Sequence, residues 1–417
     1  MGTLSVLFSL RHPSVKKPYI YRHQSISMKH RQTFSTPLLV IIHILAVPCA
    51  VLPAHAQASL PVQPPSGNYI ASPKILAGIA AATPPDKAVA PLIYLASDRL
   101  KGRYIGRPEI DTAADYIAAQ FRAAGARPVP GAIHVPDANP NATGPGNTGY
   151  FQVFARHFDA NRNVSGSVAV DRLRNVIAYI PGTDPRLRDQ YLILSSHYDH
   201  LGVTIRPRME EGKLDSIYNG ARDNASGCTA VINAARYFKK HPAKRSIIFI
   251  CFTAEEEGEI GSKWYAGHPL IPINRTVYQL NIDNASYDDT ALVTLVGLGR
   301  TSEDSAIVTA CRYYGFHVNN DPTGGGLFYQ SDNAALAEHG VPAPTYSMGM
   351  RAFDSTITNR YHRLSDETGN MDMHYVVKWI RAYILAAQLI ADEPGQPRWT
   401  PGDKYEKTWK ALYPDAK

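Results

Sequence analysis

The feature that most constrains the fold of this chain is an alternation of short apolar runs with amphipathic stretches after Asn175. The runs are rich in β-branched and aromatic residues, as buried strands are, and they lie at Val176–Ile180, Tyr191–Ser195, Ile247–Thr253, Val277–Ile282 and Leu292–Val296. The stretches predicted to be helical lie at Ser226–Lys239, Gly261–Ala266, Ser302–Tyr314, Ser331–His339 and Met371–Ala391. We therefore predict an α/β fold, a single three-layer domain with a mostly parallel central sheet flanked by helices.

The region before this alternation adds little to the predicted sheet. One helix is predicted at Ile110–Ala124, where apolar side chains fall on one face and Gly125 follows. Residues 125–150 are rich in Pro, Gly and Asn and are predicted to be a surface loop, and residues 57–73 to be a flexible segment. We see no second set of sheet elements, so we predict one domain over residues 74–417, with its core at about 90–392.

The N-terminal residues have the pattern of a secretory signal. Lys29-His30-Arg31 is a positive segment, Pro37–Leu52 is apolar, and Ala54-His55-Ala56 is a cleavage site of the A-x-A type. We predict a signal peptide within residues 1–56, cleaved after Ala56, and a secreted or periplasmic protein. Met28 is the expected start, with residues 1–27 as an upstream extension. The apolar run is short and interrupted for a membrane anchor, so we expect no stable membrane association after cleavage.

The net charge of the chain comes mainly from this leader. The formal net charge is +7, but residues 1–56 hold six Lys or Arg and no Asp or Glu. Without them, 37 basic residues stand against 36 acidic ones. The charge therefore gives no reason to expect a nucleic-acid partner.

Side chains able to bind a metal follow several of the predicted strands. His197 follows the strand at Tyr191–Ser195, Glu255 and Glu256 follow the strand at Ile247–Thr253, and Asp283 directly follows Val277–Ile282. In a parallel sheet these strand ends share one edge, where ligands bind. Clustered carboxylates repel one another and are costly to desolvate, and a bound dication removes that cost.

The chemistry of these side chains suits zinc, which takes imidazole and carboxylate ligands and requires no thiolate. Asp199, two residues after His197, is placed to accept a hydrogen bond from that imidazole and fix its tautomer. Of the adjacent Glu255 and Glu256, one can bind metal while the other acts as a base. Two zinc ions roughly 3.5–4 Å apart would polarise a carbonyl and lower the pKa of a bridging water.

Several segments of the sequence together resemble one family of enzymes. In order and spacing they are similar to the co-catalytic di-zinc metallopeptidases, which include aminopeptidase Y, bacterial leucine aminopeptidases and glutamate carboxypeptidase. The resemblance spans about residues 90–390 and implies the zinc-exopeptidase (phosphorylase/hydrolase-like) architecture. It is carried by His197–Gly202, Asp223–Gly227, Ala254–Ser262, Asn281–Asp283 and Tyr361-His362, and upstream by Leu95–Arg103 and Tyr150–Gln152.

The resemblance implies a division of the ligands between two metals. Asp223 would bridge both zinc ions. His197 and Asp283 would complete one site, and Glu256 and His362 would complete the other. The cofactor implied is thus two Zn²⁺ per chain.

The resemblance also implies the catalytic roles. Glu255 would be the general base, Asp199 would orient His197, and Tyr361 would donate a hydrogen bond to the oxyanion. The sequence departs from the common pattern at Asn284-Ala285 and after His362, where Arg363-Leu364 replaces a Thr-Pro pair. These departures leave the ligands in place and put the shape of the substrate pocket in doubt.

Other polar residues have simpler interpretations. Glu257 is expected in a solvated turn, and Asp332 at the N-cap of a helix, with a role in a substrate pocket as the alternative. Gly324–Gly326 lacks the Lys of a phosphate-binding loop and is expected in a pocket loop. The remaining histidines considered are expected to be structural: His200, His268, His317, His339 and His374.

The leading functional prediction is a secreted zinc-dependent exopeptidase, a metallo-aminopeptidase that removes N-terminal residues from peptide substrates. A carboxypeptidase or dipeptidase on the same two-zinc centre is the alternative. It would need Arg or Lys to hold a carboxylate, and Arg351 and Arg360 lie near His362 in sequence. A non-catalytic binding module of the same fold is a third hypothesis, which the intact set of ligands and base disfavours.

Overall fold

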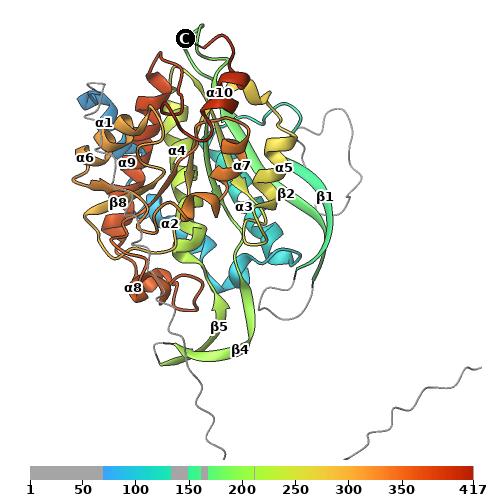
Figure 1. Ribbon diagram of the computed structural model, residues 1–417. Coiled ribbons are helices and arrows are strands. Elements are labelled where there is room, and N and C mark those ends of the chain that lie inside the picture. Colours follow the sequence, from blue (N-terminus) through green and yellow to red (C-terminus); the bar gives the residue numbers. More distant parts are fainter. Residues whose placement is uncertain (1–68, 133–148, 161–167, 211, 417) are drawn as a thin grey trace, which may run out of the picture. The chain divides into compact units, whose positions relative to one another are not determined.

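The computed structural model describes residues 69–132, 149–160, 168–210 and 212–416 (Figure 1). The predictions for the leader at 1–56 and for most of the segment at 57–73 lie outside these residues. The helices of the described residues are α1 (Pro73–Ala82), α2 (Pro85–Leu95), α3 (Pro108–Ala124), α4 (Gly227–Lys240), α5 (Ile260–Gly267), α6 (Asp304–Tyr313), α7 (Asn333–Glu338), α8 (Ser355–Thr358), α9 (Met373–Asp392) and α10 (Glu406–Leu412).

The strands of the described residues form two sheets. The larger sheet has eight strands in the order β1-β2-β6-β3-β7-β10-β8-β9. Their bounds are β1 (Phe151–Ala160), β2 (Val168–Ile180), β3 (Tyr191–His197), β6 (Ser246–Phe252), β7 (Thr276–Ile282), β8 (Leu292–Val296), β9 (His317–Asn319) and β10 (Thr345–Met348). The smaller sheet is a hairpin of β4 (Gly202–Glu210) and β5 (Lys213–Tyr218).

The middle of the large sheet is parallel, as predicted. β3 pairs in parallel with β6 on one side and with β7 on the other, and β7 pairs in parallel with β10. β1 and β2 are antiparallel to their neighbours, and β8 is antiparallel to β10. The predicted α/β fold with a mostly parallel central sheet is therefore confirmed, with antiparallel strands added on both sides.

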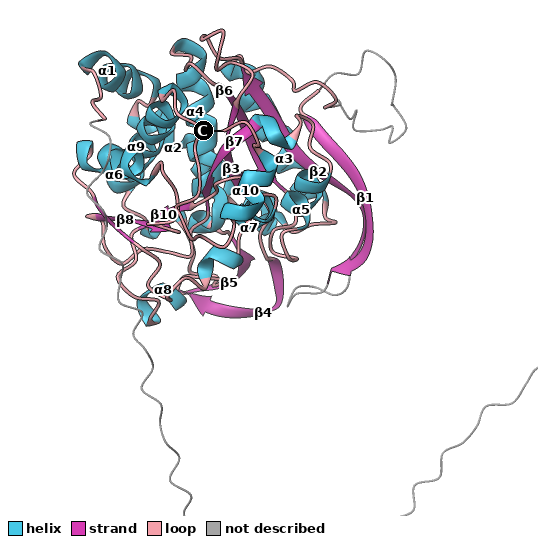
Figure 2. Ribbon diagram, turned by 45° about the horizontal axis from the view of Figure 1, so that its top comes forward, coloured by secondary structure: helices cyan, strands magenta, loops and turns pink. Residues whose placement is uncertain are grey.

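The central strands are buried on both faces because helices cover both. Successive residues of a strand point to opposite faces. Leu192 and Leu194 of β3 belong to a core shared with α4 and α9, whereas Ile193 belongs to a second core shared with α5 and α7. Figure 2 shows the strands between these two groups of helices. Strands covered in this way read as continuous apolar runs, which is the pattern that predicted them.

The helix ends follow ordinary capping chemistry. α3 begins at Pro108 and ends at Gly125, whose φ of 77° lies in the left-handed region that favours glycine. α9 begins after Asp372, whose carboxylate accepts hydrogen bonds from the backbone N–H groups of His374 and Tyr375 at 2.9 and 3.1 Å. Among the described residues no helix, α9 included, combines the length and the apolar composition needed to cross a bilayer.

The apolar pattern did not predict β1, β10 or the β4–β5 hairpin. β10 has only four residues, which is too short for a periodic signal. The hairpin lies at the bottom of Figure 1, and its apolar residues Ile205, Met209 and Leu214 are all exposed. Without a buried face, its sequence lacks the apolar pattern by which a strand is predicted. The hairpin begins just after His200 and ends just before the turn that carries Asp223. It therefore separates these two residues in the sequence, although they lie close together in space.

Candidate metal centre

Three neighbouring parallel strands bring the predicted ligands to one edge of the sheet. β3 ends at His197, and Asp283 directly follows β7. After β6 the chain turns at Ala254, whose φ is 54°, and presents Glu255 and Glu256. Because β3 lies between β6 and β7, these side chains converge as the sequence predicted.

Asp223 reaches the same place from an irregular turn that precedes α4. The turn spans Ala221–Ser226, and the peptide bond between Asp223 and Asn224 is cis. Gly220 has a φ of 57°, and a Cβ there would lie 2.2 Å from the carbonyl oxygen of Asp223 and 2.5 Å from a ring carbon of His200. Glycine is therefore required at position 220 for the turn to pack against the strand ends.

Asp223 places one carboxylate oxygen in each of two groups of ligands. Its Oδ1 lies 3.2 Å from Nε2 of His197, which is 3.3 Å from Oδ1 of Asp283. Its Oδ2 lies 3.1 Å from Nε2 of His362, which is 3.2 Å from Oε2 of Glu256. The structure thus brings together all five predicted ligands around Asp223. The side chains grouped closely enough to hold a metal ion are His197, Asp223 and Asp283 in one group and His200, Asp223 and Glu256 in the other, with His362 beside the second.

These spacings fit a tetrahedral zinc ion in each group. Ligand atoms at roughly 2.0–2.1 Å from zinc are about 3.3 Å apart at the corners of a tetrahedron. The four separations that involve His197 and His362 run from 3.1 to 3.3 Å. Asp223, Glu256 and His197 are almost fully buried, and buried carboxylates at this density require positive charge nearby. The residues present therefore fit two dications.

Protonated imidazole supplies that charge in the metal-free protein. Burial would lower the pKa of His362, but Asp223 and Glu256 outweigh burial and raise this pKa to about 10. Burial and the charge of Asp223 would raise the pKa of Glu256, but hydrogen bonds from His200 and His362 hold it at about 2. At neutral pH the metal-free site therefore holds a charged His362 against an ionised Glu256.

Glu255 stands beside the ligands without joining either group. Its Oε2 lies 3.9 Å from Nε2 of His197, and its side chain is 11% exposed. Burial raises the pKa of Glu255 well above its usual value; His197 opposes this shift, and the charges of Asp283 and Glu256 add to it. A carboxyl group with a raised pKa is a stronger base than an ordinary carboxylate, which suits it to general acid–base work.

Asp199 has a somewhat different place from the one predicted. Its carboxylate accepts hydrogen bonds from the backbone N–H groups of Glu255 and Glu256 at 3.1 and 3.2 Å, so it fixes the turn after β6. Nδ1 of His197 lies 3.3 Å from the backbone carbonyl oxygen of Asp199 but 3.8 Å from its carboxylate. The carbonyl group, rather than the carboxylate, is thus the nearer partner that can orient the imidazole.

Tyr361 lies against the last ligand. Its ring stacks on that of His362, with ring centroids 3.9 Å apart. Burial, followed by the surrounding carboxylates, raises the pKa of the Tyr361 hydroxyl, so the hydroxyl stays protonated and can donate a hydrogen bond.

A buried ion pair ties the segment of His362 to the turn of Asp223. The carboxylate of Asp366 accepts hydrogen bonds from the backbone N–H groups of Arg222 and Asp223 and from the Arg222 guanidinium, at 3.0 to 3.1 Å. Arg222 also donates to the side chain and the carbonyl oxygen of Asn370 at 2.9 Å. Sequence reasoning did not single out Arg222 or Asp366, although each lies within four residues of a ligand.

Arg103 plays a similar part between the strand ends and the hairpin. Its buried guanidinium donates to the carbonyl oxygens of Tyr198, Asn219 and Gly220 at 2.7 to 3.0 Å, and to that of Leu95. It therefore joins the two ends of the hairpin to each other. This contact gives a physical role to the upstream segment that ends at Arg103.

The other residues weighed from the sequence lie around the centre. Glu257 accepts a hydrogen bond from the Tyr104 hydroxyl at 3.2 Å and belongs to neither ligand group. Asp332 is fully buried and its side chain caps no backbone N–H of α7, so the expected capping bond is absent; burial raises its pKa to about 8. His200 was expected to be structural, but it lies inside the centre, 2.8 Å from Glu256.

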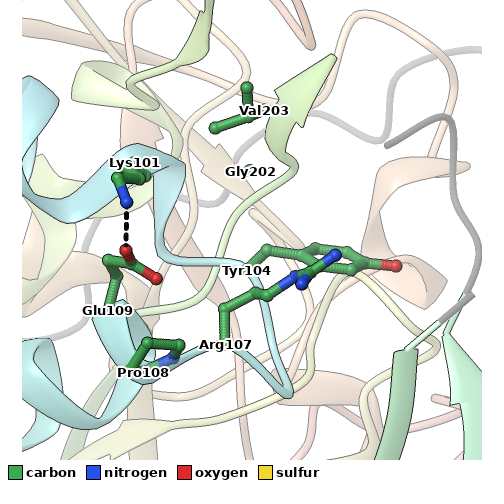
Figure 3. A pocket seen from close by; sticks show the side chains of 7 residues that line it. All are labelled: Lys101, Tyr104, Arg107, Pro108, Glu109, Gly202 and Val203. Carbon is green, nitrogen blue, oxygen red and sulfur yellow. Dashed lines mark ion pairs between the residues drawn. The ribbon is translucent and has the colours of Figure 1, made fainter. Parts of the chain in front are cut away.

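Two surface hollows lie outside the ligand groups. One, of about 330 Å³, is drawn in Figure 3 and lies where α3 and β4 begin, with an ion pair of 2.8 Å between Lys101 and Glu109 on its wall. The other, of about 390 Å³, is lined by Glu210 and by residues around His362, which are Asn359, Arg360, Arg363 and Ser365. Neither is lined by a predicted ligand.

Solved structures share this fold. An aminopeptidase from Aneurinibacillus sp. strain AM-1 superimposes with a TM-score of 0.52 at 16% identity, over 79% of this chain and 98% of that one. LapA of Legionella pneumophila gives 0.53 at 17% identity, over 78% of each chain. A glutaminyl cyclase of Porphyromonas gingivalis gives 0.50 at 14% identity, over 73% and 97%. The fold by itself therefore does not decide the reaction.

The family is given by the sequence comparison. Residues 175–387, just over half of the chain, match the description "Peptidase family M28", and this protein belongs to that family. The vacuolar membrane protease of Saccharomyces cerevisiae is 25% identical over 196 residues, which are 46% of this chain and 17% of the relative. Aminopeptidase YwaD of Bacillus subtilis is 30% identical over 136 residues, 31% of this chain and 29% of the relative.

The chain thus spans less than a third of the length of these curated relatives. The resemblance stated from the sequence motifs is confirmed, and so is the predicted class, a peptidase. The five predicted ligands and Glu255 all lie within the matched range.

Zinc binding to the metal-free protein should release protons. Because the pKa of His362 is raised to about 10 and that of His197 is raised as well, both imidazoles are protonated at neutral pH and must lose a proton to bind metal. Between about pH 6 and pH 8, zinc affinity should therefore rise by about tenfold per pH unit for each proton displaced. Calorimetry in two buffers of different ionisation enthalpy counts the protons; affinity that stays flat over this range would contradict the assignment.

Proposed function

We propose that this protein is a zinc-dependent exopeptidase, an aminopeptidase that removes N-terminal residues from peptides. The observation that carries the proposal is the Asp223 carboxylate, whose two oxygens belong to two His–carboxylate groups with Glu255 beside them. Family membership supports the peptidase class, and one of the relatives found by sequence is named as an aminopeptidase.

In this proposal two zinc ions are held by the five ligands. His197 and Asp283 would hold one ion, Glu256 and His362 would hold the other, and Asp223 would be shared by both. When bound, the two ions would supply Lewis acidity, which polarises the scissile carbonyl group and lowers the pKa of the attacking water.

Glu255 moves the proton in this reaction. It accepts a proton from the water as the new C–O bond forms, and delivers it to the amine nitrogen as the C–N bond breaks, so that one water is consumed for each peptide bond. The Tyr361 hydroxyl donates a hydrogen bond to the carbonyl oxygen of the scissile bond, which becomes negative. The carboxylate of Asp199 keeps Glu255 in place by accepting a hydrogen bond from the backbone N–H of Glu255.

The charges around the centre favour an amino terminus over a carboxyl terminus in the substrate. Asp283 and Glu255 have the more exposed carboxylates of the centre, with side chains 20% and 11% exposed, and carboxylates attract an ammonium group. The nearby guanidinium groups are engaged: Arg351 pairs with Asp289, and Arg360 donates to the carbonyl oxygen of Ser365 at 2.9 Å. A carboxypeptidase or dipeptidase remains the alternative, and the intact ligands and base disfavour a non-catalytic binding module.

One peptide in three forms tests the direction of cleavage. We expect hydrolysis of the free peptide and of its C-terminal amide, but not of its N-acetylated form, because acetylation removes the ammonium group. Mass spectrometry of the products identifies the residue released. Loss of cleavage on amidation alone would instead identify a carboxypeptidase.

Glu255→Gln should slow hydrolysis strongly while leaving zinc in place, because the amide cannot accept the proton. We expect kcat to fall by about 10²- to 10⁴-fold with little change in zinc content. Glu257→Gln is the matched control, since Glu257 lies two residues away in the same turn and bonds Tyr104. Full activity in Glu255→Gln would show that another group is the base.

We further propose that the protein is exported through its N-terminal signal and acts on peptides outside the cytoplasm. The support is the sequence pattern alone, in which a positive segment and an apolar run precede Ala54-His55-Ala56. N-terminal sequencing of the mature protein should give Gln57 as the first residue. A mature protein that keeps its apolar run would overturn this proposal.

A further inference from the structure

His200 was not among the predicted ligands, yet it lies close enough to Asp223 and Glu256 to form a possible metal-binding group with them. It is fully buried and lies between three segments that carry ligands. Its Nδ1 faces Glu256, its ring meets that of His362 edge to face at 5.8 Å between centroids, and its Cδ2 edge packs against Gly220. Its backbone N–H donates to the carbonyl oxygen of Arg103 at 3.2 Å.

We propose that His200 is a positioning residue that holds Glu256 in the orientation needed for metal binding. Nδ1 donates a hydrogen bond to Oε1 of Glu256, which leaves Oε2, 3.2 Å from Nε2 of His362, available to a metal ion. The inference rests on the proposed two-zinc function and adds a residue to it.

The distances separate His200 from the ligands. Nδ1 of His200 lies 2.8 Å from Oε1 of Glu256, which is a hydrogen-bond distance, and 3.8 Å from Oδ2 of Asp223. Nε2 of His362 lies 3.1 and 3.2 Å from oxygens of the same two carboxylates, near the roughly 3.3 Å expected between two ligands of one zinc ion. His362 thus has the spacing of a ligand toward both carboxylates. His200 is also within reach of a metal ion at Asp223 and Glu256, but its closest contact is a direct hydrogen bond to Glu256.

The other ring nitrogen fixes the direction of this hydrogen bond. Among the described residues, Nε2 of His200 has no hydrogen-bond partner although it is buried. An orphaned N–H in such a place is rare, whereas an unpaired acceptor is better tolerated. A ring proton therefore belongs on Nδ1, where the carboxylate of Glu256 can only accept it.

Glu256 needs such a partner. It is 4% exposed, and its neighbour Asp223 is also a buried carboxylate. Hydrogen bonds to ligating carboxylates orient them, and loss of one typically weakens metal binding by about 10- to 100-fold. Without the bond from His200, repulsion between the two carboxylates would turn Glu256 away from the shared position.

Three substitutions of His200 distinguish a role as hydrogen-bond donor to Glu256 from a role in which the side chain only fills space. The side-chain amide nitrogen of Asn can take the place of Nδ1, whereas that of Gln reaches the place of Nε2, and Ala removes both. Dissociation constants for the two zinc ions are measured on the full chain by competition with a chromophoric chelator. His268→Ala is the matched control, because His268 stacks on Trp264 and belongs to neither ligand group.

We expect His200→Ala and His200→Gln to weaken the binding of one zinc ion by about 10- to 100-fold and to leave the other unchanged. His200→Asn should bind both ions nearly as well as the wild-type chain. Thermal unfolding with a chelator present shows whether each variant is folded, and His200→Asn and His200→Gln, both polar amides, can be compared directly if His200→Ala does not fold.

The outcomes distinguish this inference from the proposed function. If the wild-type chain binds fewer than two zinc ions, the two-zinc function itself fails. If it binds two and His200→Ala binds them equally well, only the role of His200 is overturned. It is also overturned if His200→Asn is as weak as His200→Gln, or if the visible spectrum of the Co²⁺-loaded protein shows that His200→Asn loses a ligand.

Discussion

The parallel pairing of β3 with β6 and β7 is the constraint on which the rest of this structure depends. Because the three strands run in one direction, the residues that follow them are delivered to one edge of the sheet. The strands themselves are buried along almost their whole length, so they fix these positions firmly. The cost is a concentration of carboxylates that only protons or metal ions can balance.

Asp223 connects the residues at the strand ends with His362, because its two carboxylate oxygens contact His197 and His362. It does not come from a strand. Its turn packs closely at Gly220, and its backbone N–H donates a hydrogen bond to the carboxylate of Asp366. The segment of His362 approaches from the other end of the sequence and is tied to the same turn through Arg222. The two ligand groups are therefore parts of one assembly, in which a shift of the Asp223 turn would disturb both.

The sequence was sufficient for the central strands and for the residues at their ends. Buried strands appear as continuous apolar runs, and acidic or imidazole side chains directly after them are conspicuous. It was insufficient for β10 and the hairpin, which have no long apolar run. It was also insufficient for His200, because its bond to Glu256 joins residues 56 positions apart and nothing local in the pattern marks it. The ion pair of Arg222 and Asp366, whose residues are 144 positions apart, was not predicted for the same reason.

Arg103 has a consequence for how this chain can vary. By binding the carbonyl oxygens of Tyr198, Asn219 and Gly220, it closes the base of the β4–β5 hairpin and fixes the spacing between its two ends. The length of the hairpin beyond that base is then decoupled from the ligands on either side. Lengthening a loop whose ends are already held costs little free energy, so the hairpin is a natural insertion point, at which added residues can reshape the surroundings of the site while its chemistry stays constant.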